Sequence, residues 1–218
     1  MKRLALFSLF VTFLITSTLA YAVNPEPLEN SNMVKKATLG NSNVAIKIDY
    51  IKFTDNDIED FEVDKGVYIG IEGYTEIIEN LYLGLETGYA KPTGQVDVGG
   101  LFEIETEVFF IPIELNLKYT VEVVPEFAIG LGAGVSYNYG KGEASAPGSS
   151  VSVDDFYFGG QFFADFNYRW GNLVIGANGK YQIMEDEEGS VEFLGATIPY
   201  DYNYNNWRVG GHIGVLFD

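Results

Sequence analysis

The chain has 218 residues, enough for one sizeable domain, and 47% of them are hydrophobic although the mean hydropathy is only +0.04. With 31 acidic and 13 basic residues, the formal net charge is −18, which argues against a nucleic-acid partner because phosphate contacts need clustered Lys and Arg. Cysteine is absent, which excludes disulfide bonds, thiol nucleophiles and thiolate metal sites.

The N-terminal segment has the three parts of an export signal. Lys2 and Arg3 give it a basic start, residues 4–19 are mostly apolar, and a small-x-small motif ends at Ala22. A membrane anchor is the alternative, but the apolar stretch is short and is interrupted by Ser and Thr. We therefore predict a signal peptide over residues 1–22.

After the signal peptide, residues 23–42 are predicted to form an irregular periplasmic segment, and residues 43–218 a single folded domain. In this domain apolar and polar residues alternate with a period of two, which is typical of β-strands with two different faces. The alternation predicts eight strands, over residues 44–53, 66–75, 81–89, 109–119, 127–139, 161–170, 173–183 and 207–217. Because Pro112 falls inside the fourth strand, we expect a bulge or a local break there.

The predicted connections alternate between short and long. The short ones cover residues 76–80, 120–125 and 171–172, and the long ones cover residues 54–65, 92–104, 141–154 and 185–206. Bacterial outer-membrane barrels have short periplasmic turns and long extracellular loops. The alternation therefore predicts an eight-stranded antiparallel up-and-down transmembrane β-barrel, an all-β fold, with both chain ends in the periplasm.

Alternation alone does not decide which face is outside, because a soluble lipocalin-like barrel buries its apolar face. Aromatic residues near both ends of the apolar face favour the membrane arrangement, in which two aromatic belts lie at the two interfaces. The outer belt would comprise Tyr50, Tyr89, Tyr137, Tyr139, Tyr181 and Trp207, and the periplasmic belt Tyr119, Tyr168, Trp170 and Phe217.

The polar face also favours an interior position, because its charges balance. Its basic members are Lys47, Lys118, Arg169, Lys180 and Arg208, and its acidic members are Asp49, Glu72, Glu86, Glu114 and Asp165. Balanced charges suit a crowded interior, where an unpaired charge is costly. We predict that these residues form a charge network inside the barrel, the lumen.

In its strand pattern, the chain resembles the small eight-stranded outer-membrane barrels, the OmpA-transmembrane and OmpW-like outer membrane protein β-barrel families. The segments that carry the resemblance are NVAIKIDYIKFTDNDIEDF, NLYLGLETGYA, IPIELNLKYT, FAIGLGAGVSYNYG and the closing WRVGGHIGVLFD. The chain departs from the families' frequent terminal Phe, since Asp218 follows Phe217. The resemblance implies outer-membrane lipid and the barrel-assembly machinery as partners.

Three features superficially suggest chemistry, and each has a simpler interpretation. His212, the single histidine, is interpreted as a member of the lumen's polar network, and no ligand spacing for a metal surrounds it. The acidic segment TDNDIEDFEVD lacks the Gly and Glu that a calcium-binding EF-hand loop requires. The Gly-rich segment at 127–140 is interpreted as lumen-facing small residues and not as a phosphate-binding loop. We expect no catalytic residues, metal or cofactor.

Three functions stay open. The first is a structural or surface-interaction role, because the lumen of an eight-stranded barrel is filled by side chains. The second is a narrow channel for small solutes, as in OmpW-like proteins, which the row Gly130, Gly132, Gly134 favours by removing side chains from one wall. The third is a lipid-modifying enzyme. The sequence identifies no extracellular partner.

Overall fold

The computed structural model describes residues 39–55, 58–59, 62–98, 102–146, 149–193 and 196–217. The predicted signal peptide and most of the predicted periplasmic segment lie outside these residues, so both stay predictions. In the described part of the chain, no helix is long and apolar enough to cross a membrane.

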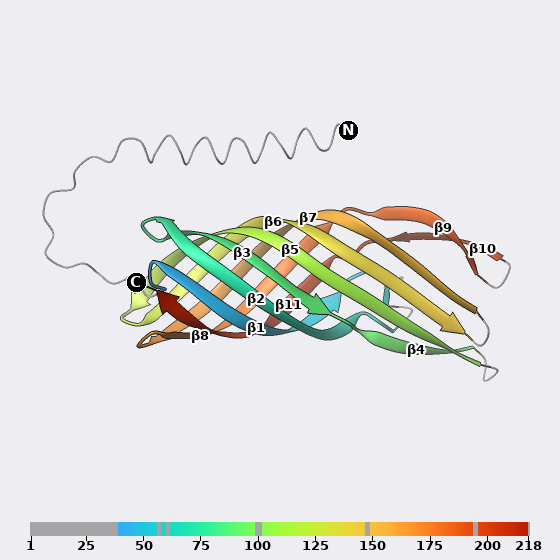
Figure 1. Ribbon diagram of the computed structural model, residues 1–218, viewed down its shortest axis with the longest axis horizontal. Helices are drawn as coiled ribbons and strands as arrows, with labels where there is room; N and C mark the ends of the chain where they lie inside the picture. Colours follow the sequence, from blue (N-terminus) through green and yellow to red (C-terminus); the bar gives the residue numbers. More distant parts are fainter. Residues whose placement is uncertain are drawn as a thin grey trace, which may run out of the picture. The chain divides into compact units, whose positions relative to one another are not determined.

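The domain is built almost entirely from antiparallel strands (Figure 1). Eight of them close into a ring in the order β1, β2, β3, β5, β6, β7, β8, β11, because β3 pairs with β5 and β1 pairs with β11. The prediction of an eight-stranded antiparallel barrel is therefore confirmed. The strands are β1 (Ser42–Phe53), β2 (Lys65–Ile78), β3 (Leu81–Ala90), β4 (Thr93–Val98), β5 (Phe102–Val124), β6 (Phe127–Ala146), β7 (Ser149–Trp170), β8 (Leu173–Met184), β9 (Glu187–Phe193), β10 (Ala196–Tyr202) and β11 (Asn206–Phe217).

The two faces of the barrel wall are inverted relative to a soluble protein. In β1, Lys47 and Asp49 are buried while Ile46 and Ile48 are more than half exposed. Because successive side chains of a strand point to opposite faces, the polar face is inside the closed ring and the apolar face is outside. The same alternation holds for the other ring strands.

The short connections are two-residue turns, and they lie at the end of the barrel where the C-terminus is found (Figure 1). Asn80, Glu126 and Gly171 in these turns have positive φ angles of 65°, 71° and 62°. Tight hairpin turns need such angles because they match the twist of the strands that they join. We call this end of the barrel the turn end and the opposite end the outer end.

Three of the four long connections were wrongly predicted as loops. Strand β4 and the first residues of β5 form a hairpin, β6 and β7 stay paired as far as Ala146 and Ser149, and β9 pairs with β10. Pairing provides partners for the backbone N–H and C=O groups of a long connection. Only the first connection, between β1 and β2, is mostly irregular in its described residues.

The structure refines the predictions for the first and the fourth strands. β1 begins at Ser42, two residues before the predicted start of the first strand at residue 44. No bulge lies at Pro112: β5 is continuous there, and its register shift relative to β6 lies between Glu122 and Val124. The alternative, a local break, is present: the ladder from β5 to β3 is interrupted beside Pro112, which has no N–H to donate. There the Thr87 hydroxyl donates a 2.7 Å hydrogen bond to the Pro112 carbonyl oxygen.

Candidate functional site

The centre of the lumen holds two carboxylates that share three cations. Glu86 accepts from Lys47 Nζ at 3.1 Å, from Lys180 Nζ at 2.6 Å and from Arg208 Nη1 at 3.3 Å. Lys180 and Arg208 also donate to Glu114. Each of these side chains is at most 3% exposed, so the ion pairs are shielded from solvent. Buried charges are tolerated only when they are paired in this way.

The network continues from this centre toward the turn end. Lys47 Nζ also lies 3.2 Å from Glu72 and 3.8 Å from Asp49. Lys118 Nζ binds Asp165 at 2.9 Å. The structure thus brings together nine of the ten charged residues singled out in the sequence, all of them buried: Lys47, Asp49, Glu72, Glu86, Glu114, Lys118, Asp165, Lys180 and Arg208. The tenth, Arg169, is buried beside a turn, where its Nε donates to the Gly171 carbonyl oxygen at 3.0 Å.

Aromatic rings also contact the buried cations. The guanidinium of Arg208 lies 4.4 Å from the centre of the Tyr68 ring, and Lys118 Nζ lies 3.8 Å from the centre of the Tyr74 ring. Tyr68 donates a 3.3 Å hydrogen bond to Glu86. Cation–π contacts of this kind are strongest where water is excluded.

An apolar layer closes the outer end of the lumen above the charges. Its centre is Tyr204, which lies in the connection between β10 and β11. The centre of the Tyr204 ring lies 5.8 Å from the ring centre of Phe53, 6.2 Å from that of Phe110 and 5.2 Å from that of Tyr157. Ile58 and Val63 of the first connection belong to the same cluster, whose other members are Ile51, Tyr68, Ala90, Val108 and Met184. Two connections therefore fold back into the barrel mouth.

A second apolar layer closes the turn end. Leu39, which precedes β1, is only 1% exposed and packs with Tyr74, Tyr82, Phe163, Val174 and Leu216. Gly40, with a φ of 65°, turns the chain at this point, and Tyr82 donates a 3.1 Å hydrogen bond to its carbonyl oxygen. The lumen is thus filled by an apolar layer, a charged layer and a second apolar layer.

The glycine row does not open a path through the lumen. A Cβ atom at Gly132 would come within 2.2 Å of the Phe163 ring, and one at Gly134 within 2.3 Å of Asn116 Oδ1. At Gly130 it would come within 2.2 Å of Asp165 Oδ1. Side chains from neighbouring strands occupy the space, so the argument for a channel that the glycines provided is wrong.

His212 lies in the lumen near the turn end, among amide side chains. Its Nε2 is 2.9 Å from Asn167 Oδ1 and its Nδ1 is 3.5 Å from Asn178 Oδ1. Asn167 and Asn178 in turn donate to Asp165 at 2.6 Å and Asp49 at 3.0 Å. The contacts of His212 are those of a member of the polar network.

The aromatic residues predicted for the two belts lie at the two ends of the apolar outer face. Tyr50 and Trp207 touch at the outer end, with ring centres 5.3 Å apart, while Trp170 and Phe217 lie at the turn end. All are exposed except Tyr139 and Trp207, which are half-buried. On β11 the two belts enclose residues 207–217, a span that fits the roughly 9–11 residues a tilted strand needs to cross a bilayer.

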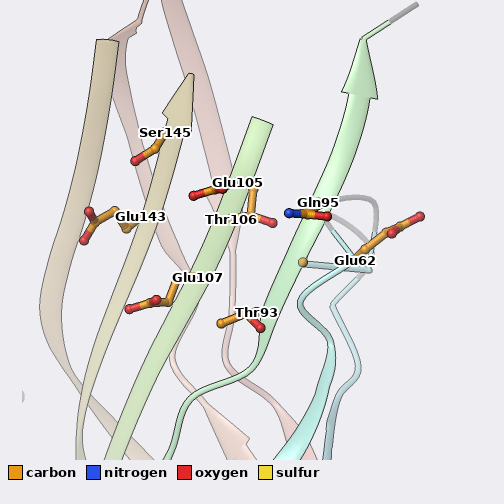
Figure 2. Close-up of a pocket in the computed structure, with 9 residues that line it drawn as sticks. Glu62, Thr93, Gln95, Glu105, Thr106, Glu107, Glu143 and Ser145 are labelled. Carbon is orange, nitrogen blue, oxygen red and sulfur yellow. The ribbon is translucent and has the colours of Figure 1, made fainter. Parts of the chain in front are cut away.

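At the outer end, the extended strands carry an acidic pocket of about 580 Å³ (Figure 2). It is lined by Glu62, Thr93, Gly94, Gln95, Glu105, Thr106, Glu107, Glu143 and Ser145. Lys91 binds Glu107 and Lys141 binds Glu143, both at 2.8 Å. The hydrogen bond from Lys141 lowers the pKa of Glu143, so this carboxylate stays charged. Among the described residues, no group of three acidic or histidine side chains is arranged to hold a metal ion.

Sequence reasoning missed the apolar layers, which depend on Leu39, Tyr204 and the first connection. A sign of the outer layer was present in the sequence, because three aromatic residues fall at inward positions of their strands, where polar residues were expected. They are Phe53, Phe110 and Tyr157. Tyr204 and Leu39 lie outside the strands and follow no period, so no pattern indicated them.

No model of a protein family matches the chain, and no curated protein does. The structure is similar to that of Neisserial surface protein A, with 15% identity and a TM-score of 0.54 over 82% of this chain and 98% of that one. The outer membrane protein OprG from Pseudomonas aeruginosa is 12% identical, with a TM-score of 0.53 over 81% of this chain and 97% of OprG. Ail, the attachment invasion locus protein of Yersinia pestis, is 14% identical, with a TM-score of 0.51 over 79% of this chain and 97% of Ail. The chain therefore has the fold of the small eight-stranded bacterial outer-membrane barrels.

Proposed function

We propose that the protein is an outer-membrane β-barrel with a structural or surface-interaction role and a lumen largely filled by side chains. The observation that carries this proposal is the inverted wall. Ile48, Leu85, Leu131 and Phe162 are each more than 60% exposed, while Arg208 and Glu114 are fully buried. An apolar surface of this extent is unfavourable in water and favourable in lipid.

The proposed orientation places the turn end and both chain ends in the periplasm. Its support is the asymmetry of the connections, because the three two-residue turns lie at one end and β4, β9, β10 and the extended parts of β5 to β7 lie at the other (Figure 1). Long connections face the outside of the cell in outer-membrane barrels. The acidic pocket would then face the medium.

The filled lumen favours action through the outer surface over passage of a solute. Three layers of side chains lie in any path along the barrel, and the central one contains the ion pairs of Glu86 and Glu114. We assign no catalytic role, because the nitrogens of His212 face Asn167 and Asn178 within the lumen network.

Flotation with lipid vesicles tests the membrane assignment. The refolded protein should float with phosphatidylcholine vesicles, run at a different gel mobility before and after heating, and aggregate in buffer without detergent. Monodisperse, folded protein in plain buffer would contradict the proposal and favour a lipocalin-like barrel.

Trypsin added to intact cells tests the orientation. Lys65 is exposed, lies at the start of β2 at the outer end, and should be cut from outside, whereas a Lys65→Gln variant should lose this cleavage. The fragment sizes identify the site. Cleavage at Lys65 only after the outer membrane has been permeabilised would reverse the orientation.

A further inference from the structure

Strand β7 extends well beyond its neighbour β8 at the outer end of the barrel. The two strands pair only from Gly159, which lies opposite Met184, although β7 begins at Ser149. On its other side, β7 stays paired with β6 over this whole extension. The chain that follows β8 forms β9, which pairs with β10 in a separate two-stranded sheet, and this hairpin diverges from the extended part of β7 (Figure 1). In the part of the chain that the structure describes, one edge of β7 over residues 149–157 therefore has no partner strand.

The backbone groups at this open edge belong to alternate residues. The Phe158 carbonyl oxygen accepts a 3.1 Å hydrogen bond from the Glu185 N–H, so the backbone of Phe158 faces the side of β8. In an antiparallel sheet, the hydrogen-bonding groups of successive residues point to opposite sides of the strand. The residues whose N–H and C=O groups face the open edge are therefore Ser150, Ser152, Asp154 and Phe156.

The extension lacks most of the features that protect natural edge strands from pairing. Such strands are often blocked by Lys, Pro or a bulge, whereas residues 149–157 contain no Lys and no Pro and pair with β6 without a bulge. The Phe156 N–H donates to Oδ1 of the adjacent Asp155 at 2.7 Å, so a side chain takes the place of a strand. The Phe156 ring stacks on Tyr137 of β6, with ring centres 5.0 Å apart. The edge is therefore held in place on β6 and open on its other side.

The surroundings of the open edge are acidic. The exposed carboxylates near it are Asp154 and Asp155 on β7 and Glu185 and Asp186 between β8 and β9. Lys141 of β6 is the cross-strand partner of Asp154, but its ammonium group binds Glu143 at 2.8 Å. The excess of negative charge favours a partner with basic side chains. A second copy of this chain would bring a net charge of −18 of its own, so the charge disfavours it.

From the open edge and its charge, we propose that residues 150–156 of β7 bind an extended, basic segment of another protein as an added strand. The segment runs antiparallel to β7, as β8 does, and continues the ladder that begins at Gly159. Its main chain pairs with Ser150, Ser152 and Asp154, and the Phe156 N–H exchanges Asp155 for a carbonyl oxygen of the segment. Main-chain hydrogen bonds provide the affinity of such added strands, and side chains provide the preference. Lys or Arg opposite Asp154 forms a cross-strand ion pair.

This inference deepens the proposed surface-interaction role, because it specifies the class of partner. Amide hydrogen exchange, measured by NMR on the whole protein in zwitterionic detergent, tests it with a synthetic decapeptide of alternating Thr and Lys. Saturating peptide should slow exchange at Ser152 and Asp154 by about tenfold or more, because their N–H groups gain a partner. Exchange at Val151 and Val153 should not change, since their N–H groups already face β6. Unchanged exchange at Ser152 and Asp154 with millimolar peptide would overturn the inference.

A proline substitution separates strand addition from attraction between charges. Ser152→Pro removes a donor at the open edge and leaves the donors that face β6 in place, so it should weaken binding of the labelled peptide by about tenfold in fluorescence anisotropy. Ser152→Ala is the matched control and should bind as the wild type does. Equal binding by these two variants would show that no strand is added.

A second variant tests the charge without changing the backbone. Asp154→Asn/Asp155→Asn should weaken binding of the Thr–Lys peptide and reduce the preference for it over an alternating Thr–Glu peptide. Glu79→Gln/Glu122→Gln changes the net charge equally at the turn end and should have no effect. An equal loss in both double variants would mean general attraction and would contradict a site on β7.

Two further measurements identify other causes. Sedimentation of the protein without peptide detects self-association, and a dimer that Ser152→Pro abolishes would replace the inferred partner with a second copy of this chain. Gel mobility before and after heating shows that each variant is folded. A wild-type protein that floats with vesicles but binds no peptide would overturn only the inference about β7, whereas a failure to float would count against the barrel assignment.

Discussion

Arg208 on β11 and Glu86 on β3 are 122 residues apart in the sequence, yet Arg208 Nη1 donates a 3.3 Å hydrogen bond to Glu86 Oε1. The two strands are not neighbours, because β2 and β1 lie between them in the ring. The pair therefore crosses the lumen and connects opposite parts of the wall. Glu86 and Glu114 together form ion pairs with cations from three strands. The charged layer therefore connects strands across the lumen and stabilises the barrel from inside.

Replacing Glu86 should therefore destabilise the barrel strongly. Glu86→Ala leaves Lys47, Lys180 and Arg208 short of one counter-charge in a region without solvent, and we expect the free energy of unfolding to fall by about 3–5 kcal/mol. Urea titration in detergent, followed by gel mobility, measures the change. Glu79→Ala at the exposed turn end is the control and should change stability by less than about 0.5 kcal/mol. Equal effects of the two substitutions would show that the polar face is a solvated exterior.

The packed glycine wall predicts a contrast between two glycines. A methyl group at Gly132 would meet the Phe163 ring and the Leu117 carbonyl oxygen, whereas at Gly179 it would meet nothing within 4 Å. Gly132→Ala should cost about 1–3 kcal/mol through overpacking, and Gly179→Ala should be nearly neutral. Unfolding in urea distinguishes the variants. If Gly132→Ala were also neutral, the space beside the glycine row would be open, and the channel interpretation would regain its support.

The apolar layer at the outer end should depend on Tyr204. Tyr204→Ala removes a buried ring from between Phe53, Phe110 and Tyr157, so a loss of about 3–5 kcal/mol is expected. Tyr204→Phe keeps the ring and should lose no more than about 1.5 kcal/mol. Thermal unfolding compares the two variants. A Tyr204→Ala protein as stable as Tyr204→Phe would mean that the connection does not seal the mouth.

The alternation of residues predicted the ring and the faces of its strands because the side-chain period of a strand is two. In β1, for example, one spacing assigns Lys47 and Asp49 to the lumen and Ile46 and Ile48 to the outside, as the structure does. The choice between an inverted and a normal wall depended on the aromatic residues at the strand ends and on the balance of charges. Both are properties of the whole pattern, so a local interruption such as the one beside Pro112 does not affect them.

What the sequence did not predict depends on contacts between distant segments. Tyr204 becomes buried only because Phe53 and Phe110 face it from two other strands. The interpretation of the glycine row as a wall without side chains beside it is wrong, because the side chain of Phe163 on the next strand fills the space beside Gly132. The prediction of loops beyond the barrel is wrong because the strand structure of these segments depends on pairing with a neighbouring segment, which composition alone does not reveal.

Conductance in planar lipid bilayers tests the central claim of a filled lumen most directly. Arg208, Glu86 and Glu114 close the middle of the barrel, and the layers around Tyr204 and Leu39 close its two ends. The reconstituted wild-type protein, shown by gel mobility to be folded, should give no sustained current steps at moderate voltage. Reproducible steps that vanish when the folded protein is left out would show an open path and contradict the account.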